Sequence, residues 1–268
     1  MECRCCRTKL DAGKWLCGLC GKWTRSAAPL AGLTVPLSQV VASDVDRIAT
    51  SGFWADLTGG GFVRGTSVVI GGEPGGGKST VALQIADTFA DESNESDGRT
   101  VYLPTEEKPS MIRARASRLQ CEHLDKIVVP TVELTPDLEF LDEIEPPGLI
   151  ILDSLPDLVG GDKNLAVVVC KRLTNYARET DAVVLILDHV TKGEELAGLM
   201  HLQHAVDLTV YLRSVGKLKR RVWETIKNRH GAGFLSCDLV MTARGLMTVQ
   251  HDEQDERVDG QDIEDGVS

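Results

Sequence analysis

A run of ten residues, 71–80, has the composition and spacing of a phosphate-binding loop. It contains the pattern G-x-x-x-x-G-K-S, which begins at Gly72 and carries its lysine at Lys78. The glycines let backbone N–H groups approach phosphate oxygens, and Lys78 is expected to reach the β- and γ-phosphates of ATP. The Ser79 hydroxyl is expected to ligate Mg²⁺. The residues predicted to line this nucleotide site are Gly72, Gly75, Gly76, Gly77, Lys78, Ser79 and Thr80.

The residues on either side supply the elements that such a loop requires. Residues 67–70 form a short apolar run rich in β-branched side chains, and they predict a buried strand that enters the loop. Apolar residues at helical spacing from Val81 to Phe89 predict a helix that leaves it. A flexible glycine-rich turn is the alternative interpretation, and the strand and the helix argue against it.

Acidic side chains follow two further predicted strands. Glu106 and Glu107 come after residues 100–103, at a position where α/β sheets hold ligands. One of them, with Glu106 preferred, could orient or deprotonate an attacking water, and two solvated acids that cap the next helix are the alternative. Asp153 directly follows the apolar residues 149–152, so it is expected to hold Mg²⁺ through water.

A cysteine module is predicted at the start of the chain. Two C-x-x-C pairs lie ten residues apart, which is the spacing of a closed structural site with four thiolates around Zn²⁺. Cys5 could replace one of the first two ligands, and free cysteines without metal are the alternative interpretation. The predicted zinc ligands are Cys3, Cys6, Cys17 and Cys20.

The composition is that of a globular protein, with 42% hydrophobic and 26% charged residues among 268. The net charge is −11, but eight acidic residues and one arginine lie after position 251, so the rest of the chain carries only −4. Any contact with nucleic acid must then be local. No signal peptide and no apolar run long enough to span a membrane is visible, which predicts a cytoplasmic protein with reduced thiols.

Strands alternate with helices along most of the chain. This order predicts an α/β fold with a mainly parallel sheet, while the last strands predict an antiparallel C-terminal edge. Residues 135–145 are expected to form one of the helices. We divide the chain into a zinc module at 1–25, a linker at 26–42, an ATPase core at 43–250 and an acidic disordered tail at 251–268.

Several of these segments together resemble the RadA (Sms) family of bacterial RecA-superfamily ATPases. The segments are Cys17–Trp23, Leu57–Gly65, Tyr102–Glu107, His189–Lys192 and Lys227–Gly231. The last resembles the K-N-R-F-G signature of the family, with His230 in place of phenylalanine. The family normally continues into a domain that resembles the Lon protease, and this sequence instead has its acidic tail.

The resemblance implies a RecA-like, ring-forming and DNA-stimulated ATPase, a helicase or branch-migration motor of recombination and repair. Glu106 would activate water, and His189 would sense the γ-phosphate. Lys227 and Arg229 would reach the nucleotide of a neighbouring subunit, as an arginine finger does. A surface position at a strand end is the alternative for these two cations. The expected assembly is a hexameric ring.

DNA contact is expected at Lys163 and Lys192, on loops that face the pore of such a ring. The basic residues between Arg213 and Arg221 are a second possible contact. Single-stranded or branched DNA is the expected substrate, and a recombinase or a replication protein is a possible partner. Two other interpretations stay open: an ATPase of the same fold that acts on a protein partner, and a nucleotide-gated adaptor without motor activity.

Overall fold

The computed structural model describes residues 46–93, 98–190, 200–216 and 220–249. Contacts divide the chain into two units, Met1–Asp44 and Val45–Ser268, and all described residues belong to the second unit. Several predictions therefore concern residues outside the described part: the zinc module with Cys3, Cys6, Cys17 and Cys20, the linker, the acidic tail and Lys192.

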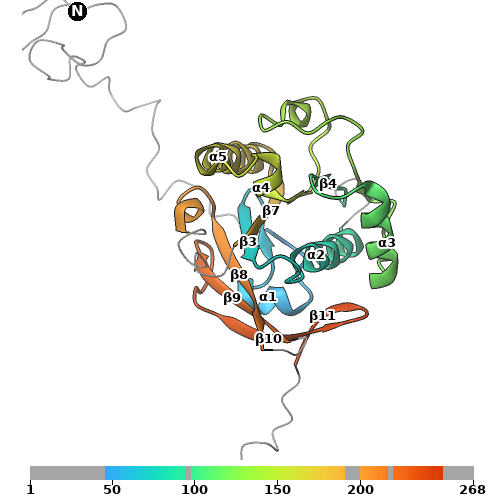
Figure 1. The fold of residues 1–268 in the computed structure, drawn as a ribbon, viewed down its shortest axis with the longest axis vertical. Coiled ribbons are helices and arrows are strands. Elements are labelled where there is room, and N and C mark those ends of the chain that lie inside the picture. Colours follow the sequence, from blue (N-terminus) through green and yellow to red (C-terminus); the bar gives the residue numbers. More distant parts are fainter. Residues whose placement is uncertain (1–45, 94–97, 191–199, 217–219, 250–268) are drawn as a thin grey trace, which may run out of the picture. The chain divides into compact units, whose positions relative to one another are not determined.

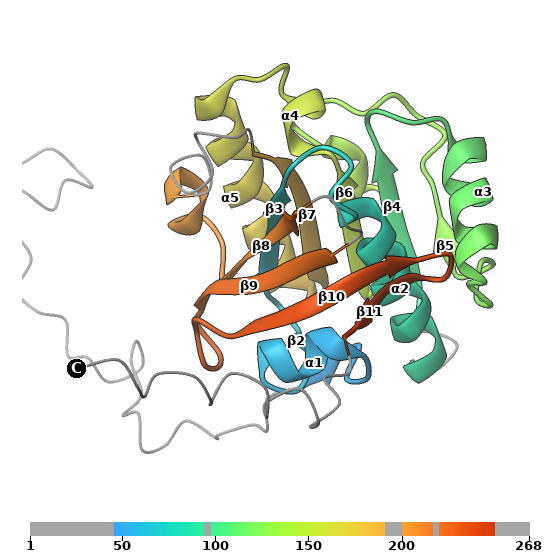
Figure 2. The same ribbon diagram turned by 60° about the horizontal axis from the view of Figure 1, so that its bottom comes forward.

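One nine-stranded sheet forms the frame of the described residues (Figure 1). Its strand order is β11-β10-β9-β8-β3-β7-β6-β4-β5, and the six strands from β8 to β5 are parallel, whereas β9, β10 and β11 are antiparallel. This confirms the predicted mainly parallel sheet with an antiparallel C-terminal edge, where β9, β10 and β11 lie side by side (Figure 2). The strands are β3 (Ser67–Gly72), β4 (Thr100–Pro104), β5 (Ile127–Val128), β6 (Leu149–Asp153), β7 (Val183–His189), β8 (Leu208–Val215), β9 (Arg220–Asn228), β10 (Ser236–Thr242) and β11 (Gly245–Thr248).

Helices cover both faces of the parallel strands (Figure 1). The two longest, α2 (Lys78–Glu92) and α5 (Lys163–Thr180), lie on opposite faces, and α3 (Pro109–Leu119) lies beside α2. Two short helices, α1 (Phe53–Thr58) and α4 (Leu155–Leu158), precede the sheet and follow β6, respectively. A small two-stranded sheet joins β1 (Arg47–Ile48) to β2 (Phe62–Val63). None of the described helices is long and apolar enough to cross a bilayer.

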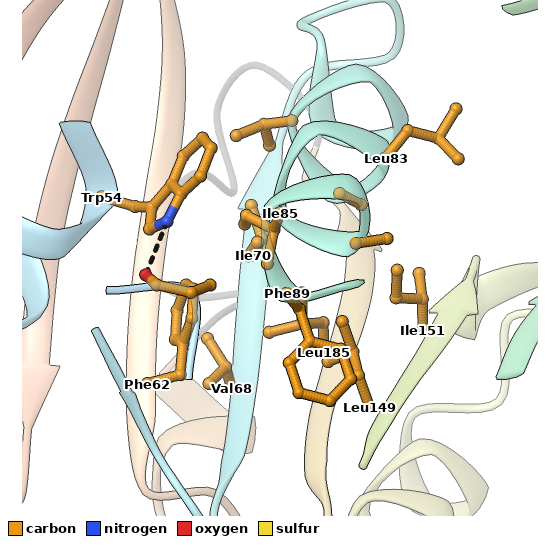
Figure 3. Packing of buried hydrophobic residues seen from close by; sticks show 14 of the residues in the cluster. Trp54, Phe62, Val68, Ile70, Leu83, Ile85, Phe89, Leu149, Ile151 and Leu185 are labelled. Carbon is orange, nitrogen blue, oxygen red and sulfur yellow. Dashed lines mark hydrogen bonds between the residues drawn. The ribbon is translucent and has the colours of Figure 1, made fainter. Parts of the chain in front are cut away.

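The two covered faces explain why the central strands contain runs of consecutive apolar residues. Along β3, Val68 and Ile70 belong to the core under α2, while Val69 belongs to the core under α5. Figure 3 shows the first of these cores, with Phe89 of α2 lying over Leu149 and Leu185 of the sheet. Each such buried side chain contributes about 1.5–3 kcal/mol. Two-sided burial therefore fixes the strands whose ends carry the candidate site.

The helix predicted over residues 135–145 is wrong. The structure has only a short 3-10 helix, η2 (Glu139–Asp142), and its N-cap Leu138 has a left-handed backbone with φ 53°. Pro146 and Pro147 follow, and a residue before proline is disfavoured in the helical conformation. Leu138 and Leu141 are nevertheless fully buried, so the apolar pattern marks residues that pack against the core rather than a helix.

Candidate functional site

The phosphate-binding loop connects β3 to α2, and the surrounding packing requires its glycines. Gly77 is the N-cap of α2 and has φ 109°, a conformation that favours glycine. A Cβ on Gly72 would lie 2.4 Å from the carbonyl oxygen of Leu212, and one on Gly77 would lie 2.6 Å from Cε of Met241. The loop is therefore held closely by β8 and β10, strands far from it in sequence.

Lys78 is almost fully buried at the first position of α2. Its ammonium donates to the carbonyl oxygens of Gly72 and Glu73 at 2.9 and 3.0 Å and lies 3.3 Å from Nδ1 of His189. Burial lowers the pKa of Lys78, and nearby carboxylates, first that of Asp153, partly offset this effect. Three acceptors thus hold the ammonium at the loop, where phosphate oxygens of a nucleotide could replace them.

Asp153 ends β6 next to β4 and lies close enough to Lys78 to interact with its charge. The hydroxyl of Tyr102 donates a hydrogen bond to Oδ2 of Asp153. Burial raises the pKa of Tyr102, and Asp153 adds to this, so the phenol stays protonated and orients the carboxylate. A carboxylate and the half-buried Ser79 hydroxyl are hard oxygen ligands of the kind that Mg²⁺ prefers. The donor set therefore fits the predicted metal.

Glu106 lies at the centre of a polar cluster just beyond the end of β4. Its Oε1 lies 2.6 Å from Nε2 of His189 and accepts a hydrogen bond of 2.7 Å from the Ser154 hydroxyl. The same hydroxyl lies 2.7 Å from Oδ2 of Asp157. Burial acts to raise the pKa of Glu106, but its hydrogen bonds, with Asp157 first, hold the pKa below its usual value. Glu106 is thus kept ionised, as a general base requires.

Asp157 has the opposite shift. Burial and the hydrogen bond with Glu106 raise its pKa. The ligand atoms of Glu106, Asp157 and His189 all lie within 4.8 Å of one another. Asp157 therefore completes a compact polar cluster with Glu106 and His189 at the end of the parallel strands.

Glu107 is directed elsewhere. Its Oε1 forms an ion pair of 2.5 Å with Nη2 of Arg115 on α3. This contact orients the Glu107 carboxylate toward a helix and leaves Glu106 as the acid joined to His189. The geometry thus favours Glu106 over Glu107 as the candidate base.

His189, the last residue of β7, connects the phosphate-binding loop to the candidate base. Its Nδ1 faces the Lys78 ammonium and its Nε2 faces the Glu106 carboxylate. A ring that carries its proton on Nε2 satisfies both contacts, because Nδ1 then accepts and Nε2 donates. A continuous set of polar contacts therefore runs from Lys78 through His189 to Glu106.

Lys227 and Arg229 lie at the opposite end of the parallel strands from this cluster. Their neighbour Asn228 pairs with Leu208 at the start of β8, whereas Gly72 of the loop pairs with Leu212. Four residues of strand separate the two levels by roughly 13 Å. The structure thus does not bring these two cations to the phosphate-binding loop of the same chain.

Each of these cations has partners in its own chain. Lys227 donates to the carbonyl oxygens of Gln203 and Val206, the latter at 2.7 Å. Arg229 forms an ion pair of 2.8 Å with Asp207, and its side chain remains 44% exposed. Asp207 therefore holds the guanidinium of Arg229 through Nη1, while the side chain as a whole stays partly exposed.

An arginine that local sequence reasoning did not assign to the nucleotide site lies against the loop. Nε of Arg221 in β9 donates to the carbonyl oxygen of Gly76 at 2.9 Å. The sequence offered only its place in a basic run, from which DNA contact was the expectation. Ser154, Asp157 and Tyr102 were likewise not assigned, although Ser154 directly follows the predicted Asp153.

Of the two lysines predicted to contact DNA, only Lys163 is among the described residues. It is exposed at the first position of α5, directly after the N-cap Asp162. The Asp162 side chain accepts hydrogen bonds from the amides of Asn164 and Leu165, which fixes the start of this helix. Lys163 thus has a defined place near the carboxyl ends of β6 and β7.

Known proteins resemble this chain at the level of sequence. The model of the AAA domain family matches residues 37–195. DNA repair protein RadA of Chlamydia trachomatis serovar D is 30% identical over 92% of this chain and 58% of its own length. DNA repair protein RadA of Brucella abortus is 32% identical over 82% of this chain and 52% of its own length. The chain thus spans little more than half the length of these relatives.

A solved structure resembles the fold. A KaiC-like protein from the hyperthermophilic archaeon Pyrococcus horikoshii superposes with a TM-score of 0.64 at 19% sequence identity, covering 77% of this chain and 100% of that one. At this identity the likeness concerns the fold alone.

Proposed function

Because the chain belongs to the RadA family, we propose that it is an ATP hydrolase that acts on DNA in recombination and repair. The observation that carries the proposal is the set of contacts from Lys78 through His189 to Glu106. It joins the cation of a phosphate-binding loop to an ionised carboxylate that can serve as a base. A site that only binds nucleotide would not need the carboxylate of Glu106.

The reaction is the attack of water on the γ-phosphorus of ATP, with cleavage of the bond between that phosphorus and the bridging oxygen of ADP. Loop amides and Lys78 bind the phosphates, and Glu106 accepts the proton that the attacking water loses. Ser79, and Asp153 through water, would hold Mg²⁺, which supplies neutralisation of the phosphate charge. The γ-phosphate competes with His189 for Lys78, so His189 is placed to register its presence.

We place Lys227 and Arg229 at the nucleotide of a neighbouring subunit in a ring, taken to be hexameric. Their location at the end of the parallel strands opposite to the loop excludes action on the same chain's nucleotide in this conformation. The exposed part of Arg229 can extend toward a partner. Such a finger stabilises charge in the transition state.

DNA is the proposed substrate of the motor, either single-stranded or branched, and translocation or branch migration is the proposed work. Lys163 and Lys192 would contact its phosphates, one pair from each subunit repeating around the ring. The setting is the cytoplasm, with a recombinase or replication protein as a possible partner. Zn²⁺ bound by Cys3, Cys6, Cys17 and Cys20 would fold the N-terminal module.

ATP turnover with and without single-stranded DNA tests this proposal. We expect stimulation by DNA that weakens as salt is raised, because phosphate contacts release counterions. Lys78→Ala serves as the control for contaminating ATPases. Turnover that is unchanged by DNA at low salt, in folded protein, would refute the assignment to DNA. Stimulation by a protein partner alone would then favour the second class of function, and nucleotide binding without turnover would favour the adaptor.

Subunit mixing tests the composite site. Arg229→Ala chains keep an intact phosphate-binding loop, and Lys78→Ala chains keep an intact finger. Mixing the two inactive variants should restore part of the turnover, because some loops then face an intact Arg229. A mixture that stays inactive, although the chains form joint assemblies by size, would contradict the role of Arg229 in a neighbour's site.

A further inference from the structure

A pocket adjoins the catalytic cluster, on the face of the sheet covered by α4 and α5. Its volume is about 190 Å³, and His189 forms part of its wall. Half of the lining residues are aliphatic: Leu155, Pro156, Val159, Ala166, Val190 and Leu202. Drug-sized ligands need roughly 300–1,000 Å³, so this pocket suits a smaller group such as one heterocyclic ring.

A buried carboxylate lies within this apolar wall. Asp188 is 8% exposed and lines the pocket. Among the described residues, no lysine or arginine forms an ion pair with it. Burial raises the pKa of Asp188 to about 6, and the charge of His201 is the first of the effects that oppose this rise. At neutral pH the carboxylate is therefore ionised, buried and able to accept further hydrogen bonds.

His201 provides a second polar group with unused capacity. It lines the same pocket, and its Nε2 has no hydrogen-bond partner within the described parts of the chain. A buried nitrogen without a partner costs free energy, and a ligand that supplies the partner removes that cost. Nε2 is covered in this conformation, so the ring must turn to reach a ligand. None of the steps assigned to ATP hydrolysis uses Asp188 or His201.

We propose that this pocket binds a single nucleobase of the DNA strand, with guanine as the best fit. This inference rests on the proposed action on DNA. Guanine presents a ring N–H and an exocyclic amine side by side, and the two oxygens of Asp188 can accept from both. Its flat faces would contact the aliphatic walls, and its O6 is an acceptor for His201 once the ring has turned.

The surroundings favour a base over a cationic side chain of a protein partner. Lys163 and Asp162 both line the pocket, so charge alone does not decide between a nucleotide and a cation. The aliphatic walls do decide, because they suit a flat ring better than a hydrated ammonium. Lys163 can then attract the phosphate of the bound nucleotide.

Binding of short single strands tests the proposal. The strands are oligothymidylates that carry one central guanine, hypoxanthine or adenine, and fluorescence anisotropy measures their affinity for the full chain. Hypoxanthine lacks only the exocyclic amine, so we expect it to bind about tenfold more weakly than guanine, the value of one hydrogen bond to a charged acceptor. Free guanosine monophosphate should compete weakly, because it lacks the contacts of a strand.

Asp188→Asn should abolish the difference between guanine and hypoxanthine. The ratio of the two affinities is the proper readout, because removing a negative charge raises the affinity for every strand. Asp181→Asn is the matched control: it removes one exposed charge at a left-handed position that asparagine tolerates, and should leave the ratio unchanged.

Each outcome separates this inference from the proposed function. Equal affinity of wild-type protein for guanine and hypoxanthine strands would overturn the pocket assignment while leaving binding to DNA intact. Failure to bind any strand would instead overturn the action on DNA on which the inference rests. A guanine preference that survives Asp188→Asn would show that another part of the chain reads the base.

Discussion

Asp188 and Asp207 are both buried carboxylates, and they lie toward opposite ends of the parallel strands. Asp188 is next to the end of β7, and Asp207 directly precedes β8. Asp207 accepts a hydrogen bond of 3.1 Å from the amide of Ser67 and forms ion pairs with Arg229 at 2.8 Å and Arg178 at 3.2 Å. Within the described residues, Asp188 has no such ion pair.

The two pKa values move in opposite directions for this reason. Burial acts to raise the pKa of Asp207, but the Ser67 amide, Arg178 and Arg229 together hold it below its usual value. Burial without an ion pair raises the pKa of Asp188 to about 6. At the end of the strands that carries Asp207, the charges stabilise the fold. At the end that carries the phosphate-binding loop, polar groups keep hydrogen-bonding capacity for ligands.

The largest expected effect is the loss of ATP turnover at the end of the strands that carries the phosphate-binding loop. Lys78→Ala should reduce ATP turnover to background, because the variant loses the cation that binds the β- and γ-phosphates. The fold should persist, since the change removes a buried ammonium whose pKa burial lowers. Phosphate release and thermal unfolding measure the two properties. Turnover near the wild-type rate would refute the assignment of the site.

Glu106→Gln should lower kcat on the order of 10²-fold or more, as expected for the loss of a general base. Binding of ATP should change little, because the loop and Lys78 remain. Glu107→Gln is the matched control, since its carboxylate pairs with Arg115 instead of His189. Equal losses of kcat in the two variants would contradict the distinction between the two acids.

At the end of the strands that carries Asp207, the expected effect is on the free energy of unfolding. Asp207→Asn should lower the free energy of unfolding by about 2–3 kcal/mol, less than for a fully buried pair because both arginines are partly exposed. Since the folded-state pKa of Asp207 is depressed, its contribution is present above the unfolded pKa and is lost as pH falls through the folded pKa. Chemical denaturation at neutral pH measures the loss. No change in stability would show that the ion pairs contribute nothing.

Asp188→Asn should have the opposite effect to Asp207→Asn and raise the free energy of unfolding by roughly 2 kcal/mol at pH 7. The folded-state pKa of about 6 lies above the usual value of 3.8, so ionisation of Asp188 disfavours the folded state as pH rises between these values. The gain should therefore be complete above pH 6 and vanish near pH 4. Denaturation across this range measures it. A gain that is independent of pH would contradict the buried charge.

The sequence predicted the parts of the fold that local patterns encode. Apolar runs that end in glycine or aspartate predicted β3 and β6, and the spacing from Val81 to Phe89 predicted α2, because two-sided burial leaves a signal in adjacent residues. It misjudged residues 135–145, where an apolar pattern packs on the core without forming a full helix. Two-sided burial is visible in sequence, but the backbone of a surface segment is not.

Contacts between distant strands explain what the sequence could not predict about the site. The carbonyl of Gly76 and the side chain of Arg221 are 145 residues apart, and only the pairing of β8 with β9 brings them together. Asp188 directly precedes the segment His189–Lys192 that resembles the RadA family, and nothing in its neighbours revealed its burial. Roles that depend on register or on burial therefore needed the structure.

The smallest predicted effect concerns β9, which runs between the two ends of the strands compared above. Arg221 contacts the phosphate-binding loop near one end of this strand, and Lys227 lies near the other end. Arg221→Gln should raise KM for ATP about fivefold with little change in kcat, since it removes one hydrogen bond that positions the loop and does not touch the reacting atoms. Steady-state kinetics separates the two constants.

The neighbouring arginine supplies the control for this prediction. Nη2 of Arg220 lies 3.8 Å from Oδ1 of Asp238 on β10, so this side chain is directed to a neighbouring strand and Arg220→Gln should leave KM unchanged. Arg221→Lys should restore part of the affinity, because an ammonium can still donate to Gly76. If Arg221→Gln instead lowers kcat and leaves KM unchanged, β9 acts on the transition state. The strand would then link the loop to the end with Lys227 and Arg229, which we propose to face the next subunit, and the two ends of the strands would not be independent.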